Sequence, residues 1–168
     1  MRRLFAALFL IASLGAAHAD DNASCAEFAW PLETEKAWFA SSDLRKVPNG
    51  ETIPALADGA IELQLAELST ANLPKPPERA PKPPDLRAGF VSFTTLPKAG
   101  ILQVTLTGEG WIDMIQNEAY LQAKEHTGKR DCPGLRKSVR FEVKQESLIL
   151  QISGADMNAI GIAFRFAD

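Results

Sequence analysis

The chain has 168 residues, 46% of them hydrophobic, with 21 acidic and 18 basic residues and a net charge of −3. A chain of this length can bury one full core, so we expect a single domain. The acidic balance argues against binding to nucleic acid, which requires an excess of Lys and Arg.

The first 19 residues have the pattern of a secretory signal peptide. Arg2 and Arg3 precede an apolar run that ends at Ala17-His18-Ala19, an A-x-A cleavage motif. The run is shorter than the roughly 20 residues of a membrane helix, and no second run is long enough to span a bilayer. The sequence therefore predicts cleavage after Ala19 and an exported protein, periplasmic or secreted, with no membrane span once the leader is removed.

Two cysteines, Cys25 and Cys132, lie in the remaining chain. In an oxidising compartment such a pair predicts one disulfide, and two buried free thiols are the alternative. A loop of about a hundred residues would be closed, which stabilises the fold by about 4–5 kcal/mol in the chain-entropy model. The two cysteines lack the close spacing of zinc ligands.

Residues 20–88 form an expected N-terminal arm. Pro31, followed by Glu33 and Glu35, suits the first turn of a short helix over about 31–41. Residues 44–59 are rich in Pro, Gly and polar residues and predict a loop. In residues 61–65 apolar and polar side chains alternate, which indicates a half-buried strand.

Residues 73–84 contain six prolines and cannot form a helix interior or a central strand. We expect an extended, polyproline-like strap that crosses from one sheet to the other. The alternative is a ligand segment for a groove-binding partner protein.

Residues 89–168 form an expected compact β unit. Short segments with the patterns of strands alternate with turn signals, among them a turn at Asn117-Glu118. With the strand at 61–65, the number of strands is eight, which predicts a mainly β fold, an antiparallel β-sandwich or jelly roll with a short N-terminal helical arm. The seven segments are 90–96, 101–107, 111–116, 119–123, 139–143, 148–152 and 160–166.

The sequence offers little for catalysis. His126 is the one histidine outside the leader, whereas non-haem iron sites use two histidines and a carboxylate, and catalytic zinc uses several His or Cys ligands. Neither a G-x-S-x-G elbow nor a phosphate-binding glycine loop is present. We therefore expect no catalytic residues, no metal ligands and no cofactor.

A basic segment, Lys129–Arg140, is the most distinctive local feature. It holds five basic residues and one acidic residue in an otherwise acidic chain. It is either a recognition patch for an anionic ligand, such as a glycan or another envelope component, or a solvated loop whose charges are balanced by nearby acids. The candidate patch consists of Lys129, Arg130, Arg136, Lys137 and Arg140, with Trp111 and Tyr120 as stacking contacts.

Asp113 is unusual because it shares a strand face with Trp111 and Ile115. If that face points inward, the carboxylate is partly buried and requires a cation. Arg136, Lys137 and Arg140 are the nearest candidates in the sequence for a structural ion pair with Asp113.

The order of segments in Gly89–Phe166 resembles the small β-sandwich of bacterial pre-peptidase C-terminal domains. The resemblance rests on a glycine turn, residues 101–106, residues 111–114, residues 139–141 and a final alternating strand. It covers about half of the chain beyond the leader, and it implies a β-sandwich fold.

A wider set of segments is similar to a group of uncharacterised exported bacterial proteins. These segments are Cys25 with Phe28–Pro31, and Cys132–Phe141. The similarity implies an exported compartment and transfers no catalytic residue. Some members of that group are described as homogentisate 1,2-dioxygenases, whose iron ligands a chain with one histidine beyond the leader does not supply.

Three functions remain open from the sequence. The leading one is a non-catalytic envelope binding or accessory module, with the basic segment as its binding surface. The second is an enzyme of jelly-roll type, and the third is a structural partner in an envelope complex.

Overall fold

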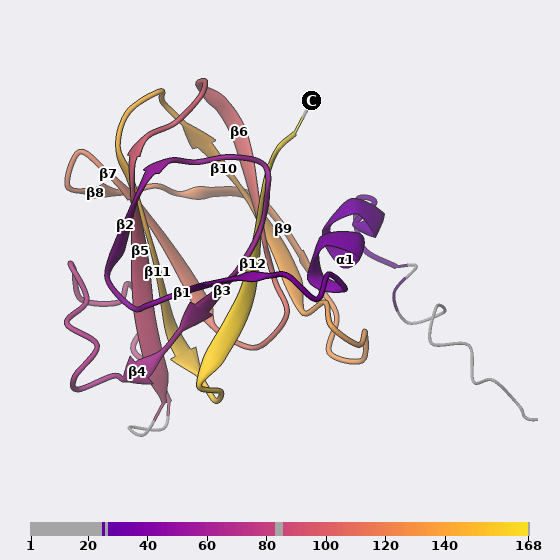
Figure 1. Ribbon diagram of the computed structural model, residues 1–168, viewed down its shortest axis with the longest axis horizontal. Helices are drawn as coiled ribbons and strands as arrows, with labels where there is room; N and C mark the ends of the chain where they lie inside the picture. The colour runs from indigo at the N-terminus through magenta and orange to yellow at the C-terminus, as the bar shows by residue number, and fades with distance from the viewer. Residues whose placement is uncertain (1–24, 26, 83–85, 168) are drawn as a thin grey trace, which may run out of the picture.

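The computed structural model describes residues 25, 27–82 and 86–167, so the expected leader lies outside the described residues. These residues contain one short helix and twelve strands (Figure 1). Their bounds are α1 (Glu33–Phe39), β1 (Arg45–Val47), β2 (Glu51–Ala55), β3 (Gly59–Gln64), β4 (Ala66–Glu67), β5 (Arg87–Thr95), β6 (Gly100–Leu106), β7 (Trp111–Gln116), β8 (Ala119–Tyr120), β9 (Ala123–Gly128), β10 (Lys137–Val143), β11 (Leu148–Ala155) and β12 (Ala159–Phe166).

The strands form two mixed sheets. Sheet A has the order β1-β3-β12-β6-β10-β9, and sheet B has the order β2-β5-β11-β7-β8, with β4 also paired to β5. Most neighbours are antiparallel, but β1 pairs with β3 and β2 pairs with β5 in parallel. The fold is therefore mainly β, as expected, but the eight-strand count and the jelly-roll closure are not confirmed.

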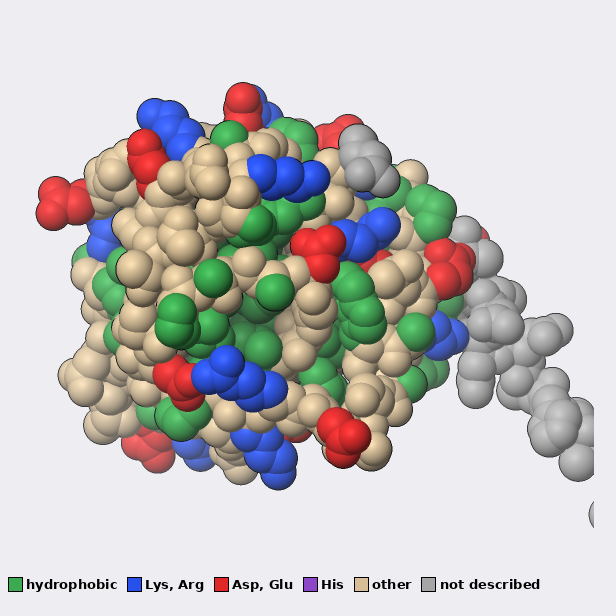
Figure 2. Space-filling model, turned by 45° about the horizontal axis from the view of Figure 1, so that its top comes forward, with side chains coloured by type: hydrophobic (Ala, Val, Ile, Leu, Met, Phe, Trp, Pro, Cys, Tyr) green, Lys and Arg blue, Asp and Glu red, His purple; other side chains and the backbone are tan. Residues whose placement is uncertain are grey.

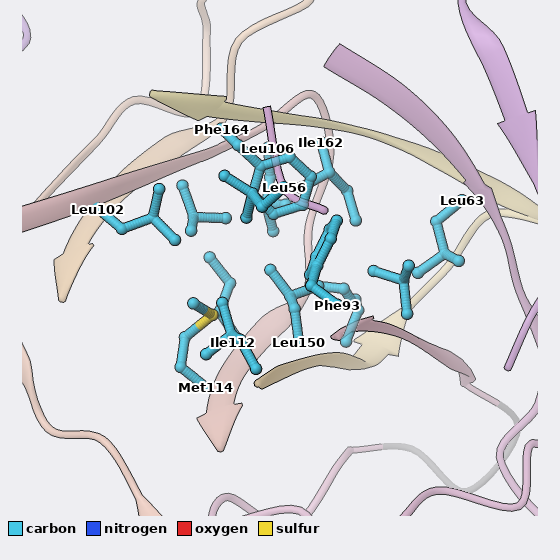
Figure 3. Packing of buried hydrophobic residues seen from close by; sticks show 14 of the residues in the cluster. Leu56, Leu63, Phe93, Leu102, Leu106, Ile112, Met114, Leu150, Ile162 and Phe164 are labelled. Atoms are coloured by element: carbon cyan, nitrogen blue, oxygen red, sulfur yellow. The ribbon is translucent and has the colours of Figure 1, made fainter. Parts of the chain in front are cut away.

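The core lies between the inner faces of the two sheets (Figure 3). The period of two along each strand sends alternate side chains inward, so Ile112 and Met114 of β7 are almost completely buried. Phe93 of sheet B meets Phe164 of sheet A edge to face, with ring centroids 5.2 Å apart. This geometry suits the aromatic quadrupoles and links the two layers.

The two sheets are joined along both of their edges. On the near side in Figure 1, β1 of sheet A continues through a short turn into β2 of sheet B. At the other edge, residues 121–122 lead from β8 of sheet B into β9 of sheet A. Among the described residues no strand pairing connects these edges, so the sheets do not close into a barrel.

Each sheet also has a covered outer face. The first described part of the expected arm, residues 25 and 27–41, lies on sheet A, where α1 contacts β3 and β12; it is called the arm below. The strap, residues 72–82, starts after β4 and leads back toward β5, so it covers sheet B (Figure 1). The expectation that the strap passes from one sheet to the other is therefore wrong, because the strands before and after it, β4 and β5, pair with each other in sheet B.

Seven of the eight segments with strand patterns form strands, and α1 lies within the expected helix. The expected strand 119–123 is divided, because only residues 119–120 form β8 and residue 123 already belongs to β9 of the other sheet. The turn at Asn117-Glu118 is also confirmed, with φ angles of 49° and 61° that suit a tight hairpin. Four strands were missed. β1 and β2 lie at sheet edges within the expected loop 44–59, β4 has two residues, and β9 is mostly exposed and lacks alternation.

Charged side chains surround a hollow in the surface that Figure 2 shows. Hydrophobic side chains gather near the middle of this face, and Lys, Arg, Asp and Glu side chains lie around them. Cations and anions are interspersed here, and neither sign dominates the face.

Candidate anion-binding cleft

The site is built on β7, whose side chains point alternately to the core and to the outer face of sheet B. Because Ile112 and Met114 point into the core, Trp111 and Asp113 point to the outer face of sheet B, beneath the strap. Asp113 is 1% exposed. The burial expected for this carboxylate is correct, but the strap buries it, and the core between the sheets does not.

Neutral donors surround Asp113. Its Oδ1 accepts a hydrogen bond from Trp111 Nε1 at 2.7 Å, and its Oδ2 accepts from Gln151 Nε2 at 3.0 Å. The backbone N–H of Glu78 in the strap also donates to Oδ2, at 3.4 Å. No ion pair of Asp113 occurs among the described residues. The expected ion pair is therefore replaced by hydrogen bonds that fasten the strap and orient the indole.

A cleft of about 290 Å³ opens beside Trp111. Four basic side chains line it: two from the strap, one from the residue before β10 and one from the first residue of β10. They are Arg79, Lys82, Arg136 and Lys137. The Arg79 guanidinium lies 5.5 Å and the Lys137 ammonium 5.7 Å from the centre of the Trp111 ring, within the range of cation–π attraction.

Positive charge exceeds negative charge in the cleft, because four basic side chains and one acidic side chain, Glu109, line it. Arg136 forms an ion pair with Glu109, with 2.5 Å between Nε and Oε1. Burial above all, with the nearby Arg136 and Arg79 acting in the same direction and Glu109 and Asp113 opposing them, lowers the pKa of Lys137 from 10.5 to about 8. A partly desolvated ammonium beside two guanidinium groups is a site that an anion would stabilise.

Ser153 supplies a buried polar group to the same cleft. This residue of β11 is fully buried and lines the cleft, and its Oγ has no hydrogen-bond partner among the described residues. The register of β11 shifts between Ile152 and Ala155, and Gly154 adopts a φ of +70° that favours glycine. A buried hydroxyl without a hydrogen-bond partner destabilises the fold. A ligand that accepts a hydrogen bond from Ser153 Oγ would recover this free energy.

The remaining residues of the expected patch lie outside the cleft. Lys129 pairs with Glu27 of the arm, and Arg140 pairs with Glu125 at 3.0 Å and lies 4.1 Å from the centre of the Trp30 ring. Arg130 is exposed. For this part of the segment the solvated, acid-balanced interpretation describes the geometry better.

Tyr120 does not join Trp111. Its hydroxyl donates to the carbonyl of Pro76, and Lys75 Nζ lies 4.9 Å from the ring centre. Burial raises the pKa of this phenol, with Asp113 and Glu78 adding to the rise. Tyr120 therefore holds the strap, whereas Trp111 lies in the cleft.

His126 is exposed on β9. Among the described residues, no group of three or more His, Cys, Asp or Glu side chains is placed to hold a metal ion. The Cys25–Cys132 disulfide is confirmed, with an S–S length of 2.04 Å, and it joins the arm to the loop before β10. Within the same residues no helix is long and apolar enough to cross a membrane.

Sequence reasoning missed two cationic residues of the cleft, Arg79 and Lys82. Their signal was present, because both lie between the prolines of a segment whose rigidity fixes where its side chains can reach. What the sequence lacked was the location of the strap, which depends on the buried Asp113.

Comparison of the chain with protein-family models, with curated proteins and with solved structures finds no match. The cleft and its residues are therefore the basis for a functional proposal.

Proposed function

We propose that this chain is an exported, non-catalytic binding module that captures an anionic group of an envelope component in the cleft beside Trp111. The observation that carries the proposal is the convergence of Arg79 and Lys137, 58 residues apart in sequence, on one indole ring. The expected leader and the disulfide are consistent with an exported protein.

Each residue of the cleft has a distinct part in the proposed binding. Lys137 supplies positive charge in a partly desolvated place, where charge-assisted hydrogen bonds are strong, and the exposed Arg79 adds a second positive charge. The hydroxyl of Ser153 donates one further hydrogen bond. Arg136 already has Glu109 as a partner, so its contribution is smaller.

Titration calorimetry with inorganic pyrophosphate tests the proposal. We expect binding that weakens with added salt, because surface charges are screened over about 10 Å at 0.1 M. The Arg79→Gln/Lys137→Gln double variant should bind at least tenfold more weakly. Lys46→Gln is the matched control, because Lys46 is exposed on β1, at the opposite end of sheet A from β9 and β10. Pyrophosphate affinity that is equal in the double variant and the wild type would refute the proposal.

The pH dependence gives a second readout on the same variants. Lys137 loses its charge as the pH rises through about 8, so pyrophosphate affinity should fall near that pH in the wild type. The fall should be absent in a Lys137→Gln variant. A fall of equal size in both proteins would show that another group titrates.

Dextran sulfate separates a glycan ligand from a small anionic group. If an acidic glycan is the partner, dextran sulfate should compete with pyrophosphate, and the competition should be lost in the double variant. Pyrophosphate binding without competition would assign the cleft to small head groups.

A further inference from the structure

A second cavity, of about 430 Å³, adjoins the cleft. It lies near the edge where the two sheets are joined by residues 121–122, between β7 of sheet B and β9 and β10 of sheet A. Its inner wall is apolar and belongs to the main core: Ile112, Val139 and Phe141 are 6%, 8% and 2% exposed. The link at residues 121–122 bounds it, with Leu121 also among its lining residues.

The cavity and the cleft share three residues. Trp111, Arg136 and Lys137 line both, so the cationic groups lie at the border between a polar cleft and an apolar cavity. The volume of the cavity is within the range of about 300–1,000 Å³ that small-molecule sites occupy. A ligand that fills both spaces would need a charged end for the cleft and an apolar end for the cavity, which is the composition of an amphiphile.

We propose that the ligand is an amphipathic anion with a single acyl chain, whose head group binds between Arg79 and Lys137 and whose chain enters the second cavity. This inference rests on the proposed function, because the head group uses the same cleft. The apolar wall formed by Ile112, Val139 and Phe141 favours an acyl chain, which loses no hydrogen bonds when it packs there. The rest of the lining includes polar side chains, namely Glu78, Gln122, His126 and Thr127. The positive charge at the border favours a carboxylate or phosphate head over an amine.

Calorimetry with butyrate, octanoate and octylamine, at pH 7 and below micelle-forming concentrations, tests the proposal. Each methylene that enters the cavity should strengthen binding about fourfold, so octanoate, with four more methylenes, should bind about 250-fold more tightly than butyrate. Octylamine has the same chain length as octanoate and a positive charge, so it should bind at least tenfold more weakly than octanoate.

The Ala123→Phe variant blocks the cavity without touching the core, because Ala123 is exposed on β9 and lines the cavity. It should reduce the octanoate affinity toward that of butyrate and leave the pyrophosphate affinity unchanged. Ala55→Phe is the matched control, since Ala55 is exposed on β2 and lines neither space.

The outcomes separate the two proposals. Pyrophosphate binding with no gain from butyrate to octanoate would overturn the acyl-chain inference and leave the proposed function standing. A gain that persists in Ala123→Phe would also overturn it, because the chain would then bind elsewhere. Failure of both pyrophosphate and octanoate to bind would reject the two proposals together.

Discussion

The two outer faces of the sandwich are covered in different ways, although both covers bury a carboxylate. On the inner side of the arm, Glu35 accepts a hydrogen bond from Gln103 Nε2 at 2.6 Å and forms an ion pair with Arg165 at 2.7 Å. Under the strap, Asp113 receives only neutral donors, among them Gln151. In each case a glutamine on a central strand holds the carboxylate in place.

The arm closes its face and the strap leaves an opening. The arm adds a disulfide and a small apolar cluster around Leu32 and Leu135. Glu125 and Glu27 balance the cations Arg140 and Lys129 near the arm. The strap brings Arg79 and Lys82 close to Lys137, so positive charge accumulates. The difference indicates a structural role for the arm and a binding role for the strap side.

Removal of the disulfide should have the largest effect on stability. Cys25 and Cys132 are 107 residues apart, and the chain-entropy model gives a loss of about 4–5 kcal/mol when such a loop is opened. We expect this loss in the urea-unfolding free energy of the Cys25→Ser/Cys132→Ser variant. Reduction by dithiothreitol should destabilise the wild type and leave the double variant unchanged. Equal stability of the two oxidised proteins would contradict the assigned role of the arm.

Glu35→Gln should have the next largest effect, about 2–3 kcal/mol in the free energy of unfolding. The change removes a buried charge from Arg165, whose side chain is 30% exposed and recovers part of its solvation from water. Thermal and urea unfolding measure the effect. Glu33→Gln on the same helix is the control, because Glu33 is exposed. A cost no larger than that of the control would show that the ion pair contributes nothing to the attachment of the arm.

Asp113→Asn should cost less, about 1–2 kcal/mol. Three N–H groups donate to the carboxylate, and the asparagine amide would turn a donor toward at least one of them. A lower melting temperature is the measurement, with the exposed Asp156→Asn as the control. A larger cost than that of Glu35→Gln would contradict the order that we infer from a charged and a neutral set of partners.

The sequence predicted the strands whose pattern reflects one buried face. Residues 160–166 and 148–152 alternate because one side of each strand meets the core, and both form strands as expected. β1, β2 and β9 were missed because edge strands bury little, so pairing with a neighbour, and not a hydrophobic period, determines them.

The site was predicted in part for a related reason. Lys137, Arg136 and Trp111 were among the expected residues, because clustered charge and an aromatic side chain can be read locally. The sequence could not predict which cations of the basic segment line the cleft and which lie outside it, since this depends on where Glu27, Glu109 and Glu125 lie in space. The sequence gives no distance between residues 79 and 137.

The hydrogen bonds of Asp113 couple the strap to the indole ring. One oxygen binds Trp111, and the other binds the backbone of Glu78, the residue before Arg79. The cleft therefore exists only while the strap is docked, and a ligand in it would stabilise the docked strap by mass action. Capture of the anion and completion of the fold on this face would then be a single equilibrium.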